Sequence, residues 1–334
     1  MPVVVVTGAA GHVGANLVRA LLDRGQRVRA LVHQSRQALE GLDVEIVSGD
    51  VTDVAALTRA FDGAELVYHT AAYISLAMRE WERLEAVNIV GTRNVVDACL
   101  ECGVQRLIHF SSVEALADAP SGQVVDEARP LVESGRSSPY AFSKAVSHRE
   151  VQQGLARGLD AVILNPTGII GPHDYRLGLA SSGLLALASG KLWALVEGGF
   201  DWVDVQDVVK GALAAAACAP SGGQYILSGH WVSLLDLAEL VKEIRGVDVP
   251  RLVMPMWLAR VGAPFVMAFG RLSGKRPLYT TGALKPLCGY RLISHARATR
   301  ELGYRPRPLK RSIADTLQWF EVQGLLAPGI QPPL

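Results

Sequence analysis

Near the start of the chain, residues 3–14 have the sequence VVVVTGAAGHVG. The first five residues are all β-branched, which is typical of a strand covered on both faces, and a helical pattern runs from His12 to Arg24. Between the two, Gly8 permits a tight turn, Gly11 lets backbone N–H groups approach a pyrophosphate, and Gly14 lets the helix pack close to the strand. The stretch therefore predicts a strand, a phosphate-binding turn and a helix whose N-terminus attracts an anion.

The alternation of apolar runs and amphipathic segments continues through the first half of the chain. Further strands are expected at Arg27–Val32, Val44–Ser48, Glu65–Thr70, Arg106–Ser111 and Ala161–Asn165, and helices at Val54–Phe61, Glu80–Cys102 and Pro139–Arg157. Such an alternation predicts an α/β fold with a doubly wound, parallel Rossmann sheet.

The rhythm changes after Pro166. We expect helices over Ser182–Gly190 and Val203–Ala217, a strand over Gln224–Ser228 that returns to the sheet, and a mostly helical chain from Trp231 onward. The predicted division is a dinucleotide-binding Rossmann domain of residues 1–170 and 201–230, with a smaller, mostly helical substrate-binding lobe of residues 171–200 and 231–334.

Composition narrows the class of ligand. The chain has 334 residues, with 33 Lys and Arg against 32 Asp and Glu. A balance so close to neutral, without a basic stripe, argues against nucleic acid and favours a small molecule. Four scattered cysteines are too few for a disulfide scaffold, and Cys99-x-x-Cys102 lacks a second ligand pair, so we expect no metal site and a reducing, cytoplasmic environment.

Two apolar segments bear on targeting. The N-terminus enters its first strand without a basic segment or cleavage site, so we expect no signal peptide. The stretch from Leu252 to Phe269 is apolar but is interrupted by Pro255, Arg260 and Pro264, so no spanning helix is expected. A helix of the substrate lobe is the favoured interpretation, and contact with a membrane surface is the alternative.

The ends of the second, third and fourth strands indicate the cofactor. No carboxylate follows the second strand to bind the ribose 2′-OH of NAD, whereas His33 and Arg36 can hold a 2′-phosphate. We therefore favour NADP(H), with NAD(H) as the alternative if Arg36 is only a solvated residue. Asp50 is expected to accept a bond from the adenine amino group, unless it merely caps a turn. Further cofactor contacts are expected from Thr7, Gly8, Gly11, His12, Val13, Gly14, Val51, Ala71 and Ala72.

A tyrosine and a lysine carry the sharpest chemical signal. Tyr140 and Lys144 lie one turn apart on the helix predicted to begin at Pro139, and a nearby ammonium lowers the pKa of a phenol from its ordinary value near 10. Tyr140 can then give a proton to a carbonyl oxygen as a hydride arrives, or take one in reverse. Ser111 and Ser112 end the fifth strand, where a hydroxyl can donate to the same oxygen, although the alternation does not tell which serine points inward.

Together these motifs resemble the extended branch of the short-chain dehydrogenase/reductase superfamily. The matching motifs are Thr7-Gly8-x-x-Gly11-x-x-Gly14, Gly49-Asp50, Ala71-Ala72, Asn88-x-x-Gly91-Thr92, Ser111-Ser112, Tyr140-x-x-x-Lys144 and Asn165-Pro166-Thr167-Gly168. The resemblance implies that Ser112, Tyr140 and Lys144 are catalytic and that Lys144 also holds the nicotinamide ribose. It places Asn88 near the site and implies nicotinamide contacts from Pro166, Thr167 and Gly168. It also implies structural roles for Asp204 and Asp207, and a homodimer formed by the helices around 80–102 and 139–157.

Within that branch the chain is more similar to dihydroflavonol-reductase-like and 3β-hydroxysteroid-dehydrogenase-like proteins than to nucleotide-sugar enzymes. It lacks the Asn that nucleotide-sugar members carry after the sixth strand, and Val113-Glu114 stands where dehydratases have an Asp-Glu pair. Apolar side chains of the second lobe are expected either to line a substrate pocket or to form ordinary core: Trp193, Leu195, Trp202, Met254, Met256, Trp257, Phe265 and Met267. Structural roles are expected for His109, His173 and His230.

Three functional hypotheses follow. The favoured one is an NAD(P)-dependent reductase or dehydrogenase that interconverts a ketone and a secondary alcohol on a mostly apolar, ring-bearing molecule. The second is a nucleotide-sugar epimerase with retained NAD. The third is a dinucleotide sensor without enzymatic activity, against which the retention of Ser112, Tyr140 and Lys144 argues.

Overall fold

The computed structural model describes residues 3–75, 78–118, 122–133, 137–273, 282, 284, 287–288 and 292–328. Its largest element is a seven-stranded sheet in the order β10-β6-β5-β4-β1-β2-β3, and every neighbouring pair is parallel. The strands are β1 Val3–Thr7, β2 Arg27–Val32, β3 Glu45–Ser48, β4 Ala64–His69, β5 Arg106–Phe110, β6 Ala161–Pro166 and β10 Gln224–Leu227. The predicted Rossmann architecture is confirmed.

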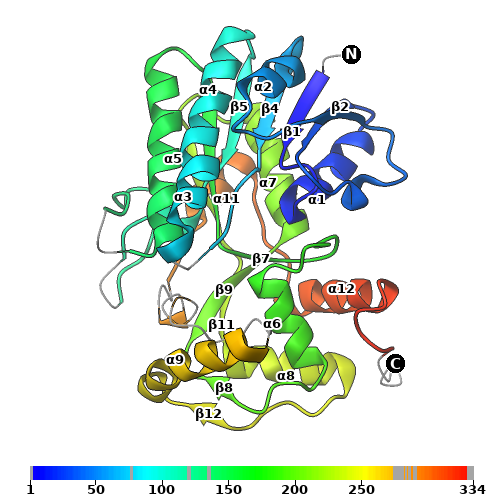
Figure 1. Cartoon of the computed structure of the whole chain (residues 1–334), viewed down its shortest axis with the longest axis vertical. Coiled ribbons are helices and arrows are strands. Elements are labelled where there is room, and N and C mark those ends of the chain that lie inside the picture. The colour runs from blue at the N-terminus through cyan, green and yellow to red at the C-terminus, as the bar shows by residue number, and fades with distance from the viewer. Residues whose placement is uncertain are drawn as a thin grey trace.

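Helices cover both faces of this sheet (Figure 1). One face packs against α1 His12–Leu22, α7 Val205–Cys218 and α11 Ala296–Leu302, and the other packs against α2 Val54–Phe61, α4 Gly91–Glu101 and α5 Pro139–Ala156. Alternate residues of β1 serve the two cores, since Val4 and Val6 face α1 while Val3 and Val5 face α2. This double burial explains why the strands are continuously apolar.

The helix predicted over Glu80–Cys102 is not uniform. Short 3₁₀ and α-helical turns at Met78–Glu80 and Trp81–Leu84 (α3) lead into a π-helical segment, Glu85–Val90, before α4 begins at Gly91. A Cβ atom at Gly91 would lie 2.5 Å from the side chain of Val51, so the close approach of α4 to the end of β3 requires glycine. A π-helical turn inside a helix is frequently found at a functional site.

The second part of the chain contains strands that the sequence did not predict. β7 Gly168–Ile170, β9 Gly199–Asp204 and β11 His230–Ser233 form a three-stranded sheet, and β8 Leu195–Val196 pairs with β12 Val253–Met254. The accompanying helices are α6 Leu179–Ala188, α8 Leu234–Arg245, α9 Met256–Ser273 and α12 Leu309–Val322. Among the helices of the described residues, none combines the length and the apolar character needed to cross a membrane.

The predicted helix over Val203–Ala217 was wrong at its beginning. Val203 and Asp204 belong to β9, and α7 starts only at Val205 because the Asp204 carboxylate accepts a hydrogen bond of 2.7 Å from the backbone N–H of Gln206. This capping interaction marks a helix start. The helix expected over Ser182–Gly190 exists, but it spans Leu179–Ala188.

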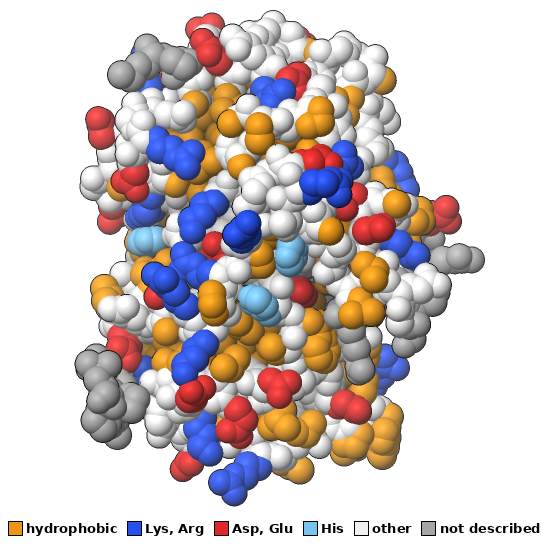
Figure 2. All heavy atoms as spheres, turned by 180° about the vertical axis from the view of Figure 1, so that it is seen from behind, with side chains coloured by type: hydrophobic (Ala, Val, Ile, Leu, Met, Phe, Trp, Pro, Cys, Tyr) orange, Lys and Arg blue, Asp and Glu red, His pale blue; other side chains and the backbone are white. Residues whose placement is uncertain are grey.

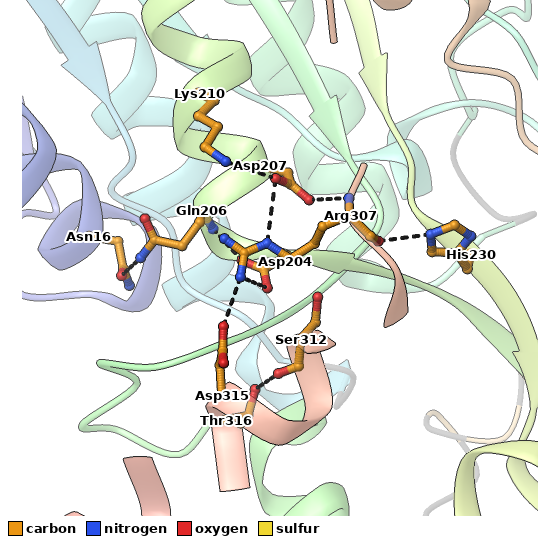
Figure 3. Close-up of polar contacts among 10 residues, drawn as sticks. All are labelled: Asn16, Asp204, Gln206, Asp207, Lys210, His230, Arg307, Ser312, Asp315 and Thr316. Atoms are coloured by element: carbon orange, nitrogen blue, oxygen red, sulfur yellow. Dashed lines mark hydrogen bonds and ion pairs between the residues drawn. The ribbon is translucent and has the colours of Figure 1, made fainter. Parts of the chain in front are cut away.

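An arginine cluster joins the two parts of the molecule (Figure 3). The Arg307 guanidinium lies 3.5 Å from the buried carboxylate of Asp204 and 2.8 Å from that of Asp315 on α12, and its backbone N–H donates to Asp207 at 2.7 Å. The Arg307 carbonyl oxygen lies 2.9 Å from Nε2 of His230 on β11. These contacts agree with the structural roles expected for Asp204, Asp207 and His230.

Candidate active site

The glycine turn after β1 is built for close backbone approach. Gly8 has φ of 68°, and a Cβ atom there would lie 2.6 Å from the backbone nitrogen of Ala71, which follows β4. A Cβ atom at Gly14 would lie 2.3 Å from the Gly8 carbonyl oxygen. No side chain of the described residues caps α1 behind Gly11, so the N–H groups of its first turn remain available to an anion. This donor set fits the pyrophosphate of a dinucleotide.

The side chains beside this turn point in different directions. The Thr7 hydroxyl is fully buried and lies 2.8 Å from Nδ1 of His69, so only the backbone of Thr7 faces the turn. His12 lies close to the backbones of Gly171 and Pro172 at the beginning of the second lobe, where burial lowers the pKa of its imidazole. Val13 is half-buried and packs against the core under α1.

The expected adenosine contacts gather at the ends of β2 and β3. The His33 ring bonds to the Asp50 carboxylate, and the exposed Arg36 guanidinium donates to Ser48 at 2.7 Å. Burial raises the pKa of Asp50, but hydrogen bonds from Thr52 and His33 outweigh it, so the pKa is lowered on balance. These polar groups therefore lie at one edge of the sheet, because the carboxyl ends of its parallel strands all lie at that edge.

Ala71, Ala72 and Val51 complete the same edge. Ala71 and Ala72 follow β4, with Ala71 against Gly8, and Val51 is buried under Gly91.

The expected reacting groups come together from β5 and α5. The Ser138 hydroxyl caps α5 by accepting from the backbone N–H of Ala141 at 3.1 Å, which starts the helix at Pro139 and puts Tyr140 and Lys144 one turn apart. The half-buried Tyr140 phenol lies beside the Ser112 hydroxyl, which by itself lowers the pKa of the phenol. Lys144 is 2% exposed, and its Nζ donates to the carbonyl oxygen of Phe110 at the end of β5 over 2.6 Å.

The structure distinguishes the two serines that the sequence left open. Ser112 turns toward Tyr140 and accepts a hydrogen bond of 3.2 Å from the backbone N–H of Glu114. Ser111 turns under α5, where its hydroxyl lies 3.4 Å from Nδ1 of the buried His148. Of the two serines, Ser112 is therefore the one beside the phenol.

Burial controls the protonation of both titratable groups. It raises the pKa of Tyr140 to about 12, together with the negative charge of Glu114 and against the hydrogen bond from Ser112. Burial also lowers the pKa of Lys144 to about 7. The expectation that the ammonium holds the pKa of Tyr140 below 10 therefore does not describe this structure, because burial and the charge of Glu114 raise that pKa. At neutral pH Tyr140 carries its proton.

Asn88 links the site to the loop after β4. Its side chain accepts from the backbone N–H of Tyr73 at 2.7 Å and donates to the Tyr73 carbonyl at 2.9 Å. The same amide donates to Ser143, between Tyr140 and Lys144, at 2.9 Å. Asn88, which lies in the π-helical turn, thus fixes the loop after Ala71 and Ala72 relative to α5.

A buried aspartate that sequence reasoning missed supports the segment expected at the nicotinamide. Asp201 is 5% exposed, and its Oδ1 accepts from the Thr167 hydroxyl at 2.6 Å and from the backbone N–H of Gly229 at 2.8 Å. Thr167 lies between Pro166, which ends β6, and Gly168, where a Cβ atom would come within 2.5 Å of the Phe200 ring. A charged residue in the apolar sequence Phe200-Asp201-Trp202 was the available signal.

The apolar residues expected to line a pocket do not gather in one place. Trp193, Trp257 and Phe265 lie on the surface, so that expectation was wrong for these three. In the described part of α9, Ala259 and Ala263 face inward with Met256, whereas Trp257 and Phe265 face outward. The others are buried or partly buried, namely Leu195, Trp202, Met254 and Met256, and the side chain of Met267 lies outside the described residues.

Comparison with known proteins identifies the family. The profile of the NAD dependent epimerase/dehydratase family matches residues 4–227, which span the glycine turn, Tyr140 and Lys144. The chain belongs to this family. Together with its relatives, this makes the chain an NAD(P)-dependent oxidoreductase of the extended short-chain dehydrogenase/reductase kind, as the resemblance indicated.

Two curated members of the family and one solved structure are similar over nearly the whole chain. The sterol demethylase protein B of Methylococcus capsulatus is 35% identical over 96% of this chain and 99% of its own length. The 3 beta-hydroxysteroid dehydrogenase/Delta 5-->4-isomerase of Mycobacterium tuberculosis is 30% identical over 91% of this chain and 86% of its own. The crystal structure of gox2253 superposes with a TM-score of 0.85 at 34% identity, covering 98% of this chain and 100% of that one.

Proposed function

We propose that this oxidoreductase interconverts a ketone and a secondary alcohol on a mostly apolar, ring-bearing small molecule. The observation that carries the proposal is that Tyr140 and the buried Lys144, one helical turn apart on α5, meet Ser112 at the edge of the sheet where the glycine turn lies. Ligands of open α/β sheets bind outside the carboxyl ends of the strands, where these groups meet.

The residues divide the chemistry between them. When bound, the nicotinamide cofactor supplies or accepts the hydride. In the reducing direction Tyr140 gives its proton to the carbonyl oxygen of the substrate, and the Ser112 hydroxyl donates a hydrogen bond to that same oxygen. The pKa of about 12 keeps the phenol protonated at neutral pH, which is the form that this step requires. Lys144 provides donors for a ribose hydroxyl beside the phenol.

The relatives support the apolar, ring-bearing class of substrate. One is named for a sterol and another for a hydroxysteroid, and both align with this chain over more than nine-tenths of its length. A fused apolar ring system with a ketone or secondary alcohol is therefore the proposed substrate class, with no preferred direction.

For the cofactor we propose NADP(H) over NAD(H). Arg36 is exposed at the end of β2, next to His33, and its guanidinium fits a ribose 2′-phosphate. The carboxylate near this position, Asp50, follows β3 rather than β2 and is already bonded to His33.

We also propose a cytoplasmic homodimer. Four free cysteine thiols support a reducing compartment, and the half-buried residues Phe142 and Val146 of α5 support a partner against α4 and α5, as the family resemblance implies.

The test is the Tyr140→Phe variant, assayed with NADPH and NADH against steroid, flavonoid and simple aromatic ketones. We expect turnover to be lost while the cofactor still binds, because the ring remains and only the acid is removed. Tyr225→Phe is the matched control. The Tyr225 phenol, on the edge strand β10, bonds to Glu301 of α11, so its loss should leave turnover unchanged.

An active Tyr140→Phe variant would refute the mechanism. Release of tightly bound NAD from the purified wild type, with turnover that needs no added cofactor, would favour a nucleotide-sugar epimerase instead. Tight cofactor binding without turnover of any ketone or alcohol would favour a dinucleotide sensor.

A further inference from the structure

Helix α9 presents large apolar side chains to solvent. Trp257, Val261 and Phe265 follow one another at four-residue intervals, so they lie on one face of the helix, and they are 67%, 60% and 74% exposed. Leu258 and Val266 border this face at 43% and 46% exposed. A helix at the surface of a water-soluble domain normally has polar residues on such a face.

These side chains are exposed because of the way α9 is oriented on the protein. The helix faces the protein with Ala259 and Ala263, which are buried against Val196 of β8. Beyond Met256, which packs on the same cluster, the described part of α9 therefore turns alanines inward and Trp257, Val261 and Phe265 outward. A contiguous exposed apolar face of this kind marks a site of contact with a partner or a membrane.

The same end of the molecule carries two further exposed apolar residues. β8 and β12 are parallel and in register, so the residues that precede them lie side by side. These include Trp193, 75% exposed, and Leu252, 55% exposed. In Figure 1, α9, β8 and β12 form the end of the molecule remote from the seven-stranded sheet, and Figure 2 shows hydrophobic side chains among basic and acidic ones at that end. We call the exposed residues of α9, with Leu252, the α9 face.

Two exposed arginines flank this face. Arg251 precedes Leu252, and Arg260 lies on α9. The exposed Glu197 carboxylate lies at the start of α9, where it accepts from the backbone N–H of Met256. Basic residues that flank an apolar helix face complement the headgroups of anionic lipids.

We propose that the α9 face docks on an anionic lipid bilayer, with α9 in the plane of the interface. Tryptophan and phenylalanine are the side chains that insert at the boundary between headgroups and acyl chains, while arginine reaches the phosphates. A second copy of the chain fits this face less well, because its own Arg251 and Arg260 would be brought against the same cations. The proposal is independent of the reaction at Tyr140.

The experiment is sedimentation of the full chain with vesicles of phosphatidylcholine alone, or of equal parts phosphatidylcholine and phosphatidylglycerol. We expect binding to the anionic vesicles that weakens as salt is added, because exposed charges are screened. The triple variant Trp257→Gln, Val261→Ser, Phe265→Ser should bind roughly tenfold more weakly, since interfacial binding scales with the apolar area inserted. The pair Arg251→Gln and Arg260→Gln should remove most of the preference for anionic vesicles.

Val322→Ser is the matched control, because Val322 on α12 is 75% exposed but lies outside the α9 face. The arginine pair tests the proposal separately if the triple variant does not fold. Failure of the wild type to bind anionic vesicles would overturn the proposal, as would undiminished binding by both variants. Light scattering in which the wild type forms a larger oligomer that the triple variant abolishes, without vesicle binding by either, would assign the face to a second copy instead.

Discussion

Asp201 offers a sharp test of how the second lobe supports the site. Replacing it with alanine removes the one carboxylate oxygen that accepts from both the Thr167 hydroxyl and the Gly229 N–H, at 2.6 and 2.8 Å. Each buried donor left without an acceptor costs about 1–3 kcal/mol. Removing a carboxylate that is only 5% exposed also removes its unfavourable burial, which offsets part of that cost. We therefore expect Asp201→Ala to lower the free energy of unfolding by about 2–4 kcal/mol.

Asp201→Asn is the matched variant, because its amide oxygen can still accept both hydrogen bonds. We expect it to lie within about 1 kcal/mol of the wild type. Burial holds the pKa of Asp201 above its ordinary value, against the hydrogen bonds from Thr167 and Gly229. Because folding raises the pKa of this carboxyl, the free energy of unfolding of the wild type falls as the pH rises through that pKa. The asparagine side chain does not ionise, so Asp201→Asn should become more stable relative to the wild type over that pH range.

Urea unfolding followed by tryptophan fluorescence measures the stability difference, and steady-state kinetics measures its effect on the site. Thr167 adjoins Pro166 and Gly168, the proposed nicotinamide contacts, so Asp201→Ala should lower kcat and increase the primary isotope effect of deuterated NADPH. Asp201→Asn should restore both. Equal stability and equal kcat for the alanine and asparagine variants would refute the reasoning, and Asp248→Ala, at an exposed aspartate, controls for the loss of a charge.

Two further predictions concern the cofactor and the phenol. Arg36→Ala should raise the KM for NADPH at least about tenfold while leaving that for NADH nearly unchanged, since it removes a phosphate contact; a parallel change in both would contradict the proposed preference. Because burial and the charge of Glu114 raise the pKa of Tyr140 to about 12, alcohol oxidation, which needs the phenolate, should increase with pH up to that value. Glu114→Gln removes one of these causes and should move the rising limb of the pH–rate profile to lower pH; an unmoved limb would show that Glu114 does not act on the phenol.

Local sequence was sufficient to predict the Rossmann half. A strand buried on both faces must be continuously apolar, and a helix one turn after a glycine trio has few alternatives, so β1, α1 and α5 were found within a few residues of their bounds. Tyr140 and Lys144 came from the same source, because a spacing of four on one helix fixes their relation before any tertiary contact forms.

Tertiary contacts decided which features arise from pairing and contact between residues that are distant in the sequence. β7 and β11 have three and four residues and are mostly half-buried, so they lack a local pattern. They form strands by pairing with β9, which lies between them. The choice of Ser112 over Ser111, the high pKa of Tyr140 and the support of Thr167 by Asp201 depend on burial and on neighbours that are far away in the chain.

Helix α9 shows the same division. Its apolar character is evident from its sequence. Whether Trp257 or Ala259 faces the protein was determined by the packing against Val196. The sequence by itself thus determined which elements form and which reacting groups share a helix, since these depend on neighbours along the chain. Only the folded structure decided which side chains are buried and which remain exposed to solvent, because desolvation depends on the packing of the whole molecule.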